Sequence, residues 1–355
     1  MEFQLDEDVA LLKSSTRELL GKESPLADAR SVMEDAPEGF SKSLHAQLGE
    51  LGYLSLLLPA ESGGMGSVAL AVVLSEMGRV AFPGPFLDVV LAVRALADCG
   101  AGGWQQRVAS GEAVVVLARR ESTRGDAPVQ LASRFHEGQV RGTKLFVPFG
   151  TQADALLVET RDGLAIVPRP DAGWNAKPMP TLDHAQRFAE IDFADAATLL
   201  AEGERARAVL ADVDRLGALG ASALLLGLAE RALEMAVDYM KEREAFGAPI
   251  AINQALQHRS ADMLLRVEGT RSSVLRAAWA TDHEPEQAPY LTHVAKAWAG
   301  PAARAVCGEA LQMHGGVGFT WEYDPHIYLK RAKTLEQFYG STRSQLEAAL
   351  QARGI

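Results

Sequence analysis

A glycine-rich turn near the C-terminus carries the first residues whose types and spacing could serve chemistry. A helix predicted to end with Leu311–His314 runs directly into Gly315–Gly318 (GGVG). Glycine lets the backbone approach a ligand closely or take a positive φ, so the amides of this turn could receive a phosphate or the edge of a ring. The alternative is an ordinary helix C-cap, which commonly uses glycine.

The composition narrows the class of partner. The chain has 355 residues, 48% of them apolar, and a net charge of −11. Binding a nucleic-acid backbone needs clustered Lys and Arg rather than an acidic surplus, so we expect no nucleic-acid partner. A polyanionic small molecule is still compatible with a local basic site or a helix end.

Cysteine usage and the start of the chain indicate a compartment. Cys99 and Cys307 lie far apart and without metal-ligand spacing, which predicts two buried thiols, a reducing compartment and no metal site. The chain begins with an acidic amphipathic segment rather than a basic one followed by an apolar core, so no signal peptide is expected. No apolar run reaches membrane-spanning length. These features predict a cytoplasmic protein that does not contact membranes.

The spacing of apolar residues predicts an α+β chain in three parts. Residues 1–110 have helical periodicity and form an N-terminal helical domain. Residues 111–200 change to the period of strands, with short runs separated by glycine, proline and aspartate, as is typical of an antiparallel β-barrel or sandwich. Residues 201–355 return to helical periodicity.

The middle part should contain a hairpin and the last part a helical bundle. Val129–Phe135 and Gln139–Val147 flank a short turn and are predicted to pair. In the last part, three long helices with core-facing apolar stripes and a fourth beginning near Asp324-Pro325 favour a C-terminal four-helix bundle. Pro301 falls inside the third helix, where it removes a backbone donor.

Two motifs in the last part make the chain similar to a known family. One is Arg243–Ile250 (REAFGAPI), followed by Gln254. The other is Gln312–Phe319 (QMHGGVGF), which continues to Tyr328–Ala332 (YLKRA). Together with the order of helices, strands and helices, these motifs resemble the acyl-CoA dehydrogenases, flavoproteins that desaturate acyl-CoA thioesters between the α and β carbons. The resemblance covers essentially the whole chain.

The resemblance implies an FAD site shared between two subunits. In this family one protomer holds the flavin, and the bundle of another holds the adenosine diphosphate half. Arg243 is then expected to meet the pyrophosphate, because a guanidinium offers fixed donors to phosphate oxygens. Phe246 is expected to pack on the cofactor, and Gln254 to form a hydrogen bond with it.

The glycine turn completes this implied cradle. By resemblance, Gln312, Gly315 and Gly316 let backbone and side-chain amide approach the adenine end of FAD. Taken singly, the same motifs also fit a surface arginine, a core phenylalanine and a helix cap. Their joint occurrence in the matching order favours the cofactor interpretation.

The usual catalytic carboxylate is missing from its expected place. Members of the family often carry a catalytic glutamate just before a Gly-Thr near the C-terminus, and Tyr339 occupies that position here. A phenol with a reference pKa near 10 is a poor base for an α-proton at neutral pH.

The positions that face the flavin also depart from the family pattern. Gly142-Thr143-Lys144 leads to Phe146 and Pro148, where the family usually offers a tryptophan and a threonine. Proline has neither hydroxyl nor N–H, so a donor to the flavin is lost. Arg119–Ser122 (RRES) stands where a Thr-Glu-Pro or Ser-Glu-Pro strand end normally helps to form the flavin and substrate site. The flavin half therefore departs from the family pattern while the adenosine half keeps it.

One other carboxylate could supply a base. A branch of the family places its base at the start of the first bundle helix beside an arginine, and Asp214-Arg215 occupies about that place. The spacing to Gly227 is some three residues longer than expected, nearly one helical turn. The alternative for Asp214 is an N-terminal helix acid favoured by the helix dipole, with Arg215 as a surface partner.

The resemblance implies a subunit of an FAD-dependent acyl-CoA dehydrogenase that passes electrons to an electron-transfer flavoprotein. The more specific hypothesis is a β-type subunit in an α2β2 assembly with a homologous larger subunit, lending its adenosine half-site to a flavin whose base lies in that partner. Paired enzymes of this kind often act on bulky acyl-CoA substrates such as steroid side-chain thioesters. The alternatives are a self-sufficient homo-oligomeric dehydrogenase with Asp214 as base, and a non-catalytic structural subunit without flavin.

Overall fold

A computed structural model describes residues 5–34, 39–123 and 130–355. The chain divides into two compact units. The first, which we call the helical unit, comprises Met1–Arg30, Ser67–Phe82 and Ala218–Ile355. The second, which we call the mixed unit, comprises Ser31–Gly66 and Pro83–Gly217.

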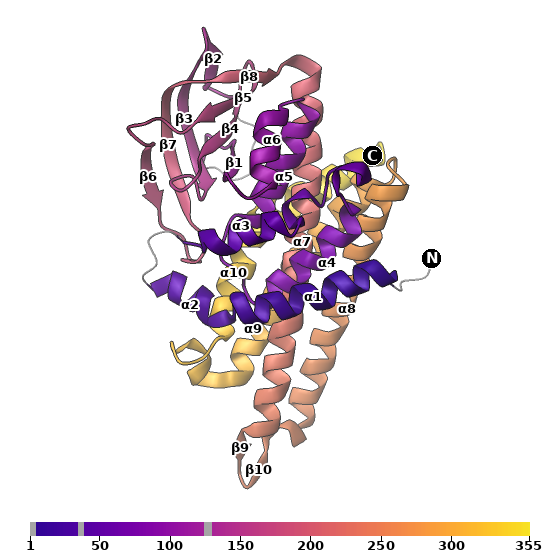
Figure 1. The fold of residues 1–355 in the computed structure, drawn as a ribbon. Coiled ribbons are helices and arrows are strands. Elements are labelled where there is room, and N and C mark those ends of the chain that lie inside the picture. Colours follow the sequence, from indigo (N-terminus) through magenta and orange to yellow (C-terminus); the bar gives the residue numbers. More distant parts are fainter. Residues whose placement is uncertain (1–4, 35–38, 124–129) are drawn as a thin grey trace. The chain divides into compact units, whose positions relative to one another are not determined.

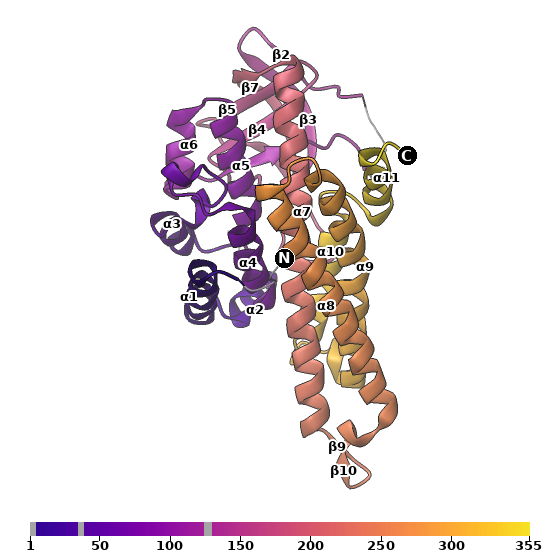
Figure 2. The ribbon, with the colours of Figure 1, turned by 90° about the vertical axis from the view of Figure 1, so that its right-hand side faces the viewer.

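The helical unit is built from long helices that carry one small hairpin. Figures 1 and 2 show α7, α8 and α9 as its longest elements, with the hairpin β9–β10 at the end where α7 passes into α8. The elements that lie wholly or partly in this unit are α1 (Glu7–Glu23), α2 (Leu26–Glu34), α4 (Gly66–Arg79), α7 (Gly203–Glu242), β9 (Glu244–Ala245), β10 (Ala248–Pro249), the 3-10 helix η3 (Ile250–Ile252), α8 (Gln254–His283), α9 (Ala288–His314), the 3-10 helix η4 (Gly315–Phe319), α10 (Pro325–Gln337) and α11 (Thr342–Ala352).

Glycine allows α4 and α7 to cross with their backbones in contact. A Cβ placed on Gly227 would lie 1.8 Å from the carbonyl oxygen of Ser75, and one placed on Gly78 would lie 2.2 Å from that of Leu224. A side chain at either position would therefore force the helices apart.

Ion pairs join α4 to α7 and to α1. Arg79 donates to Glu234 at 2.7 and 2.8 Å and approaches Glu230 at 3.4 Å. Glu76, whose side chain is 2% exposed, accepts two hydrogen bonds of 2.8 Å from Arg17 of α1. Because the buried carboxylate of Glu76 faces a guanidinium, the desolvation cost of its charge is offset.

The predicted bundle helices are present, and α10 begins with Pro325 as expected. Pro301 lies inside α9 without ending it. Contrary to the sequence expectation, α7 contains a window long and apolar enough to cross a membrane, but 78% of that window is buried inside the protein. A window that is mostly buried is what a core helix shows.

The mixed unit combines helices with two four-stranded sheets. The strand orders are β1-β4-β5-β8 and β2-β3-β7-β6. The elements not yet given are α3 (Lys42–Glu50), the 3-10 helices η1 (Tyr53–Ser55) and η2 (Ala60–Ser62), α5 (Phe86–Asp98), α6 (Gly102–Ala109), β1 (Val115–Ala118), β2 (Arg134–His136), β3 (Gln139–Pro148), β4 (Ala155–Thr160), β5 (Gly163–Pro168), β6 (Asn175–Met179), β7 (Phe188–Ala196) and β8 (Thr198–Ala201).

The sandwich form of the prediction is confirmed, with one difference in strand direction. The β1–β4 pair is parallel, from Val115 opposite Ala155 to Ala118 opposite Val158, whereas the sequence predicted antiparallel pairing. The chain between these strands forms β2 and β3 in the other sheet, and this long crossover is what a parallel pair requires. Each four-stranded sheet has two edges, so the strands form a sandwich and not a closed barrel.

The predicted hairpin of the middle part is confirmed at its turn. Glu137 and Gly138 connect β2 to β3 with φ values of 48° and 75°. Two successive positive φ values define the tight turn that matches the twist of paired strands. β2 covers only Arg134–His136, and the predicted start of that strand at Val129 lies outside the described residues.

A buried histidine in the mixed unit predicts a specific acid sensitivity. His45 of α3 is 6% exposed, and burial lowers its pKa from 6.5 to about 4. The imidazole of His45 is therefore protonated at higher pH in the unfolded chain than in the folded one. The free energy of unfolding is thus highest above pH 6.5, where His45 is neutral in both states, and it falls as the pH is lowered toward 4. The loss should be about 3 kcal/mol.

Urea unfolding at pH 7 and at pH 4 measures this loss. Wild-type protein should lose about 3 kcal/mol more unfolding free energy between the two pH values than the non-titrating variant His45→Leu. Equal losses of unfolding free energy in the two proteins would contradict the lowered pKa of His45.

Candidate functional site

The hairpin at the end of α7 presents an aromatic side chain directly to solvent. Phe246 is fully exposed (109%), and it has a φ of 57° beside Gly247 at 83°. Positive φ is costly for a bulky non-glycine residue. Hydrogen bonds from the Arg243 N–H to the Tyr239 carbonyl and from the Ile250 N–H to the Arg243 carbonyl, both 2.8 Å, fix the base of the hairpin. The tip is therefore a fixed apolar projection.

The glycine turn after α9 is open on its outer side. Gly315 has φ 64° and ψ −145°, a conformation that only glycine adopts readily. No heavy atom of the described residues lies within 4 Å of a Cβ placed on Gly315 or on Gly316. Both glycines are exposed, so a ligand could approach their backbone without displacing protein atoms.

The polar side chains predicted to hold a cofactor are exposed and available. Arg243, Gln254 and Gln312 are all exposed. Among the residues that the structure describes, none forms an ion pair or side-chain hydrogen bond with these three. Other arginines of the same bundle are paired, as in the 3.0 Å contact between Arg259 and Glu309. Exposed donors that are not paired within the described residues, together with an exposed aromatic ring and two open glycines, fit a ligand that carries phosphate and a ring system.

The positions where the family pattern places flavin contacts are, by contrast, engaged with other groups of the protein. In the mixed unit, Lys144 is fully buried and donates to Glu121 at 2.5 Å and to the Arg119 carbonyl at 3.1 Å. Glu121 also accepts from Ser133 Oγ at 2.5 Å. Burial opposes its charge, but the hydrogen bonds from Lys144 and Ser133 hold the pKa of Glu121 below its usual value.

The backbone of β3 offers no free donor at Phe146 or Pro148. Its register shifts between Lys144 and Val147, and Phe146 in the bulge has a φ of 52°. The Phe146 N–H points to the sulfur of Met179 at 3.2 Å. Pro148 has no N–H to offer. These described residues do not fit the donor pattern of a flavin site.

Asp214 is paired with an arginine that the sequence did not predict as its partner. Both carboxylate oxygens of Asp214 accept hydrogen bonds from Arg119, one of them 3.1 Å long, although the carboxylate is 55% exposed. Arg119 also binds Glu159 at 2.7 Å. The expected neighbour Arg215 instead contacts Asp212. A substrate proton would have to compete with this guanidinium for Asp214.

Tyr339 lies in a loop that is held tightly but offers no carboxylate. It has a φ of 56°, and its carbonyl accepts a hydrogen bond of 2.6 Å from Gln345. Buried Lys296 donates to the carbonyls of Glu336 and Gly340 at 3.1 and 3.0 Å. The loop is therefore ordered around a phenol where the family often has its base.

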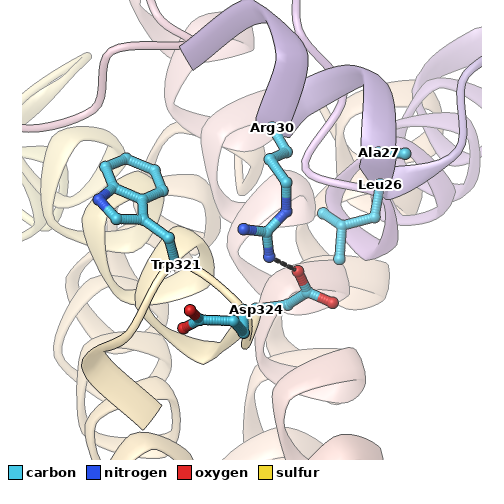
Figure 3. Close-up of a pocket in the computed structure, with 6 residues that line it drawn as sticks. Leu26, Ala27, Arg30, Trp321 and Asp324 are labelled. Atoms are coloured by element: carbon cyan, nitrogen blue, oxygen red, sulfur yellow. Dashed lines mark hydrogen bonds and ion pairs between the residues drawn. The ribbon is translucent and has the colours of Figure 1, made fainter. Parts of the chain in front are cut away.

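An open hollow of about 410 Å³ lies elsewhere in the helical unit (Figure 3). Arg30 on its wall forms an ion pair with Asp324, and the ring of Trp321 has Lys330 at 4.9 Å from its centroid. Leu26, Ala27 and Glu322 complete the lining. No residue of this hollow belongs to the predicted cradle, and the charges of Arg30 and Asp324 are paired across it.

No metal centre is evident in the described part of the chain, which contains no group of three or more His, Cys, Asp or Glu arranged to hold an ion. Cys99 and Cys307 are both buried and free. Burial raises the pKa of both thiols, that of Cys307 to about 12. Neither thiol is therefore a nucleophile at neutral pH.

Sequence reasoning missed an aromatic cluster beside the cradle. The rings of Tyr239 and His314 stack with centroids 4.3 Å apart and planes at 23°. Tyr323 meets both edge-on. The available signal was the position of Tyr239, four residues before Arg243, together with that of His314, next to Gly315.

Comparison with known proteins identifies the family. The N-terminal and C-terminal domain models of the acyl-CoA dehydrogenases match residues 6–113 and 215–353. Acyl-CoA dehydrogenase IpdE2 of Mycolicibacterium smegmatis is 32% identical over 96% of this chain and 97% of its own length. Acyl-CoA dehydrogenase FadE27 of Mycobacterium tuberculosis is 30% identical over 88% of each chain.

Solved structures agree with this assignment. A chain of the ChsE4-ChsE5 complex from Mycobacterium tuberculosis has a TM-score of 0.86 at 27% identity, covering 100% of this chain and 99% of that one. A chain of the Tcur3481-Tcur3483 steroid ACAD G363A variant has the same TM-score at 25% identity, covering 99% of each chain. The chain belongs to the acyl-CoA dehydrogenase family. It is thus an oxidoreductase that acts on acyl-CoA.

Proposed function

We propose that this chain is a subunit of a hetero-oligomeric acyl-CoA dehydrogenase and does not itself carry the catalytic base. It lends the adenosine half of an FAD site to a homologous partner subunit. The observation that carries the proposal is the contrast between its two half-sites. The donors of the cradle on the helical unit are exposed and have no side-chain partner among the described residues. On the mixed unit, Glu121 is bonded to Lys144 and the Phe146 N–H points to Met179, so these flavin-side positions are occupied by protein contacts.

The cradle residues have separate tasks in this proposal. Arg243 offers a bidentate guanidinium to the pyrophosphate. Phe246 packs on the cofactor from the tip of its hairpin, and Gln254 and Gln312 supply amide groups. The open backbone of Gly315 and Gly316 admits the adenosine end, since no atom of the residues that the structure describes lies within 4 Å of a Cβ placed on either glycine.

The chemistry of the reaction is divided between the two subunits. When bound, FAD supplies the hydride acceptor for α,β-desaturation of the acyl-CoA thioester. This chain binds and orients the cofactor, while the carboxylate that removes the α-proton belongs to the partner. Tyr339 supports that division because a phenol is a weak base at neutral pH.

The relatives support a proposal for the assembly and the substrate. The similar ChsE4-ChsE5 complex is named as a complex of two different chains, and the Tcur3481-Tcur3483 protein is named as a steroid ACAD. We therefore propose an α2β2 assembly that takes a bulky acyl-CoA, such as a steroid side-chain thioester, in the cytoplasm. An electron-transfer flavoprotein is the proposed electron acceptor.

Co-expression tests the proposal. The chain should be produced with a homologous subunit that carries a glutamate at the position of Tyr339, and each should also be produced alone. The expected result is yellow colour, the flavin absorbance spectrum and acyl-CoA-dependent dye reduction from the pair only. Flavin and turnover from this chain alone would overturn the proposal, and a colourless pair would favour a structural subunit.

Asp214 distinguishes this proposal from a self-sufficient homo-oligomer. Asp214→Asn in the co-expressed pair should leave kcat within about twofold of wild type, because the carboxylate bonds to Arg119 instead of serving as the base. Stopped-flow reduction with acyl-CoA measures the effect. A fall of about a hundredfold or more would instead support Asp214 as the general base.

A further inference from the structure

The two halves of the candidate cradle come from distant parts of the sequence. Arg243 and Phe246 follow the end of α7, whereas Gln312 and the glycine turn belong to the end of α9 and to η4. A ligand that bridges these segments binds well only if they are held in register beforehand, because ordering them on binding reduces affinity.

An aromatic cluster connects these two segments. Tyr239 lies in the last turn of α7, and its carbonyl accepts the N–H of Arg243 at 2.8 Å. His314 is the last residue of α9 and is followed directly by Gly315. Their rings stack at 4.3 Å, so the contact joins the residue that anchors Arg243 to the residue that begins the glycine turn.

A third ring fixes the geometry of this stack. Tyr323 follows η4 and meets Tyr239 at 6.3 Å and 89°, and His314 at 6.2 Å and 67°. Edge-to-face and offset-stacked arrangements at such distances are the favoured geometries of aromatic pairs. The cluster therefore joins three backbone segments: the end of α7, the end of α9 and the connection to α10.

His314 is also fixed from below. Its side chain is buried (6% exposed), and Nδ1 lies 2.7 Å from the Ala310 carbonyl, to which it must donate because a carbonyl oxygen only accepts. Gly318 packs back on the same residue, since a Cβ there would lie 3.0 Å from the His314 Cβ. Because the His314 ring packs on Tyr239 of α7 and is fixed relative to the glycine turn, a displacement of α7 would also displace the turn.

We infer that Tyr239, His314 and Tyr323 form a positioning cluster that sets the spacing between Arg243 and the Gly315-Gly316 backbone for the adenosine diphosphate end of the cofactor. The inference rests on the proposed function of the cradle. These three residues do not contact the reacting atoms. Their role is to position the backbone segments that bind the cofactor.

The test measures FAD affinity in the co-expressed complex after reversible removal of the flavin. Tyr239→Leu removes the stacking ring and should weaken FAD binding about tenfold or more, because the cradle is no longer preorganised. Tyr239→Phe keeps the ring and should restore affinity to within about twofold of wild type. ADP alone should show the same order of affinities, since it carries only the half that the cradle holds.

A matched pair elsewhere in the bundle separates positioning from general stability. Trp279 stacks on His283 at 4.7 Å and 11° within α8, and neither residue belongs to the cradle. Trp279→Leu should leave FAD affinity unchanged even if it lowers the melting temperature as much as Tyr239→Leu does.

The outcomes are distinct. Wild-type affinity for FAD in Tyr239→Leu, or equal losses in Tyr239→Leu and Trp279→Leu, would overturn the positioning role while leaving the cradle assignment intact. A wild-type complex that binds neither FAD nor ADP would overturn the proposed function itself. If Tyr239→Leu does not fold, Tyr323→Leu at a 39% exposed position gives the same comparison, and unchanged affinity there would contradict the inference.

Discussion

Replacing Arg243 with alanine in the co-expressed complex is expected to weaken FAD binding about 10- to 150-fold, the equivalent of losing roughly 1.5–3 kcal/mol of charge-assisted hydrogen bonding. Arg243 is exposed and, within the described residues, has no carboxylate partner. Its guanidinium is therefore available to phosphate oxygens without first breaking an ion pair. The same variant should leave the melting temperature of the flavin-free protein unchanged.

Two further variants sharpen this prediction. Arg243→Lys keeps the charge but not the planar fork of donors, so its affinity should fall between those of wild type and Arg243→Ala. Arg259→Ala is the matched control, because Arg259 is also an exposed arginine of the bundle but is paired with Glu309 at 3.0 Å. Isothermal titration with FAD measures all three. Equal affinity in Arg243→Ala and wild type would remove Arg243 from the cradle.

Replacing Lys144 with methionine should destabilise the mixed unit by about 3–5 kcal/mol. Lys144 is fully buried, and the side chain of Glu121 opposite it is only 6% exposed. Removing the ammonium leaves a buried carboxylate without its cation, which costs far more than the pair contributes when both charges are present. The midpoint of urea unfolding measures the loss.

Two other variants separate buried charge from the loss of any lysine. Lys177→Met breaks an exposed ion pair with Glu190 and should cost less than about 1 kcal/mol. The double variant Lys144→Met with Glu121→Gln should recover much of the stability, because the remaining amide is neutral and still accepts from Ser133. A loss as small for Lys144→Met as for Lys177→Met would show that Glu121 does not depend on this lysine.

The sequence located the candidate cradle because its residues lie in local motifs. Arg243 and Phe246 belong to one eight-residue stretch, and the tight turn at Phe246-Gly247 has the positive φ values that a short hairpin demands. The glycine turn follows a helix whose end was visible from its periodicity. The structure adds that these residues are exposed and that Arg243 has no ion-pair partner among the described residues. Neither property can be predicted from a local motif.

What could not be predicted depends on contacts between distant residues. Asp214 pairs with Arg119, which lies 95 positions away in the sequence, instead of with its neighbour Arg215. The stack of Tyr239 on His314 likewise joins residues that share no local motif. The parallel direction of β1 and β4 follows from a crossover through the other sheet, and strand periodicity carries no information on direction.

The packing of α1 and α4 against the last part of the chain could not be predicted from the sequence either. That grouping rests on the Arg17–Glu76 pair and on the close backbone crossing at Gly78 and Gly227. Charge pairs and glycines are common on many helices, so their partners become apparent only in three dimensions. The predicted domain boundaries at residues 110 and 200 therefore stay predictions about chain order.

Counting flavins per subunit tests the central claim most directly. Native mass spectrometry of the co-expressed complex, with FAD released and quantified by absorbance, gives both the subunit composition and the FAD content. We expect an α2β2 assembly with one FAD for each αβ pair and no FAD on this chain purified alone. One FAD per chain in a homo-oligomer of this protein that turns over acyl-CoA without a second polypeptide would contradict it.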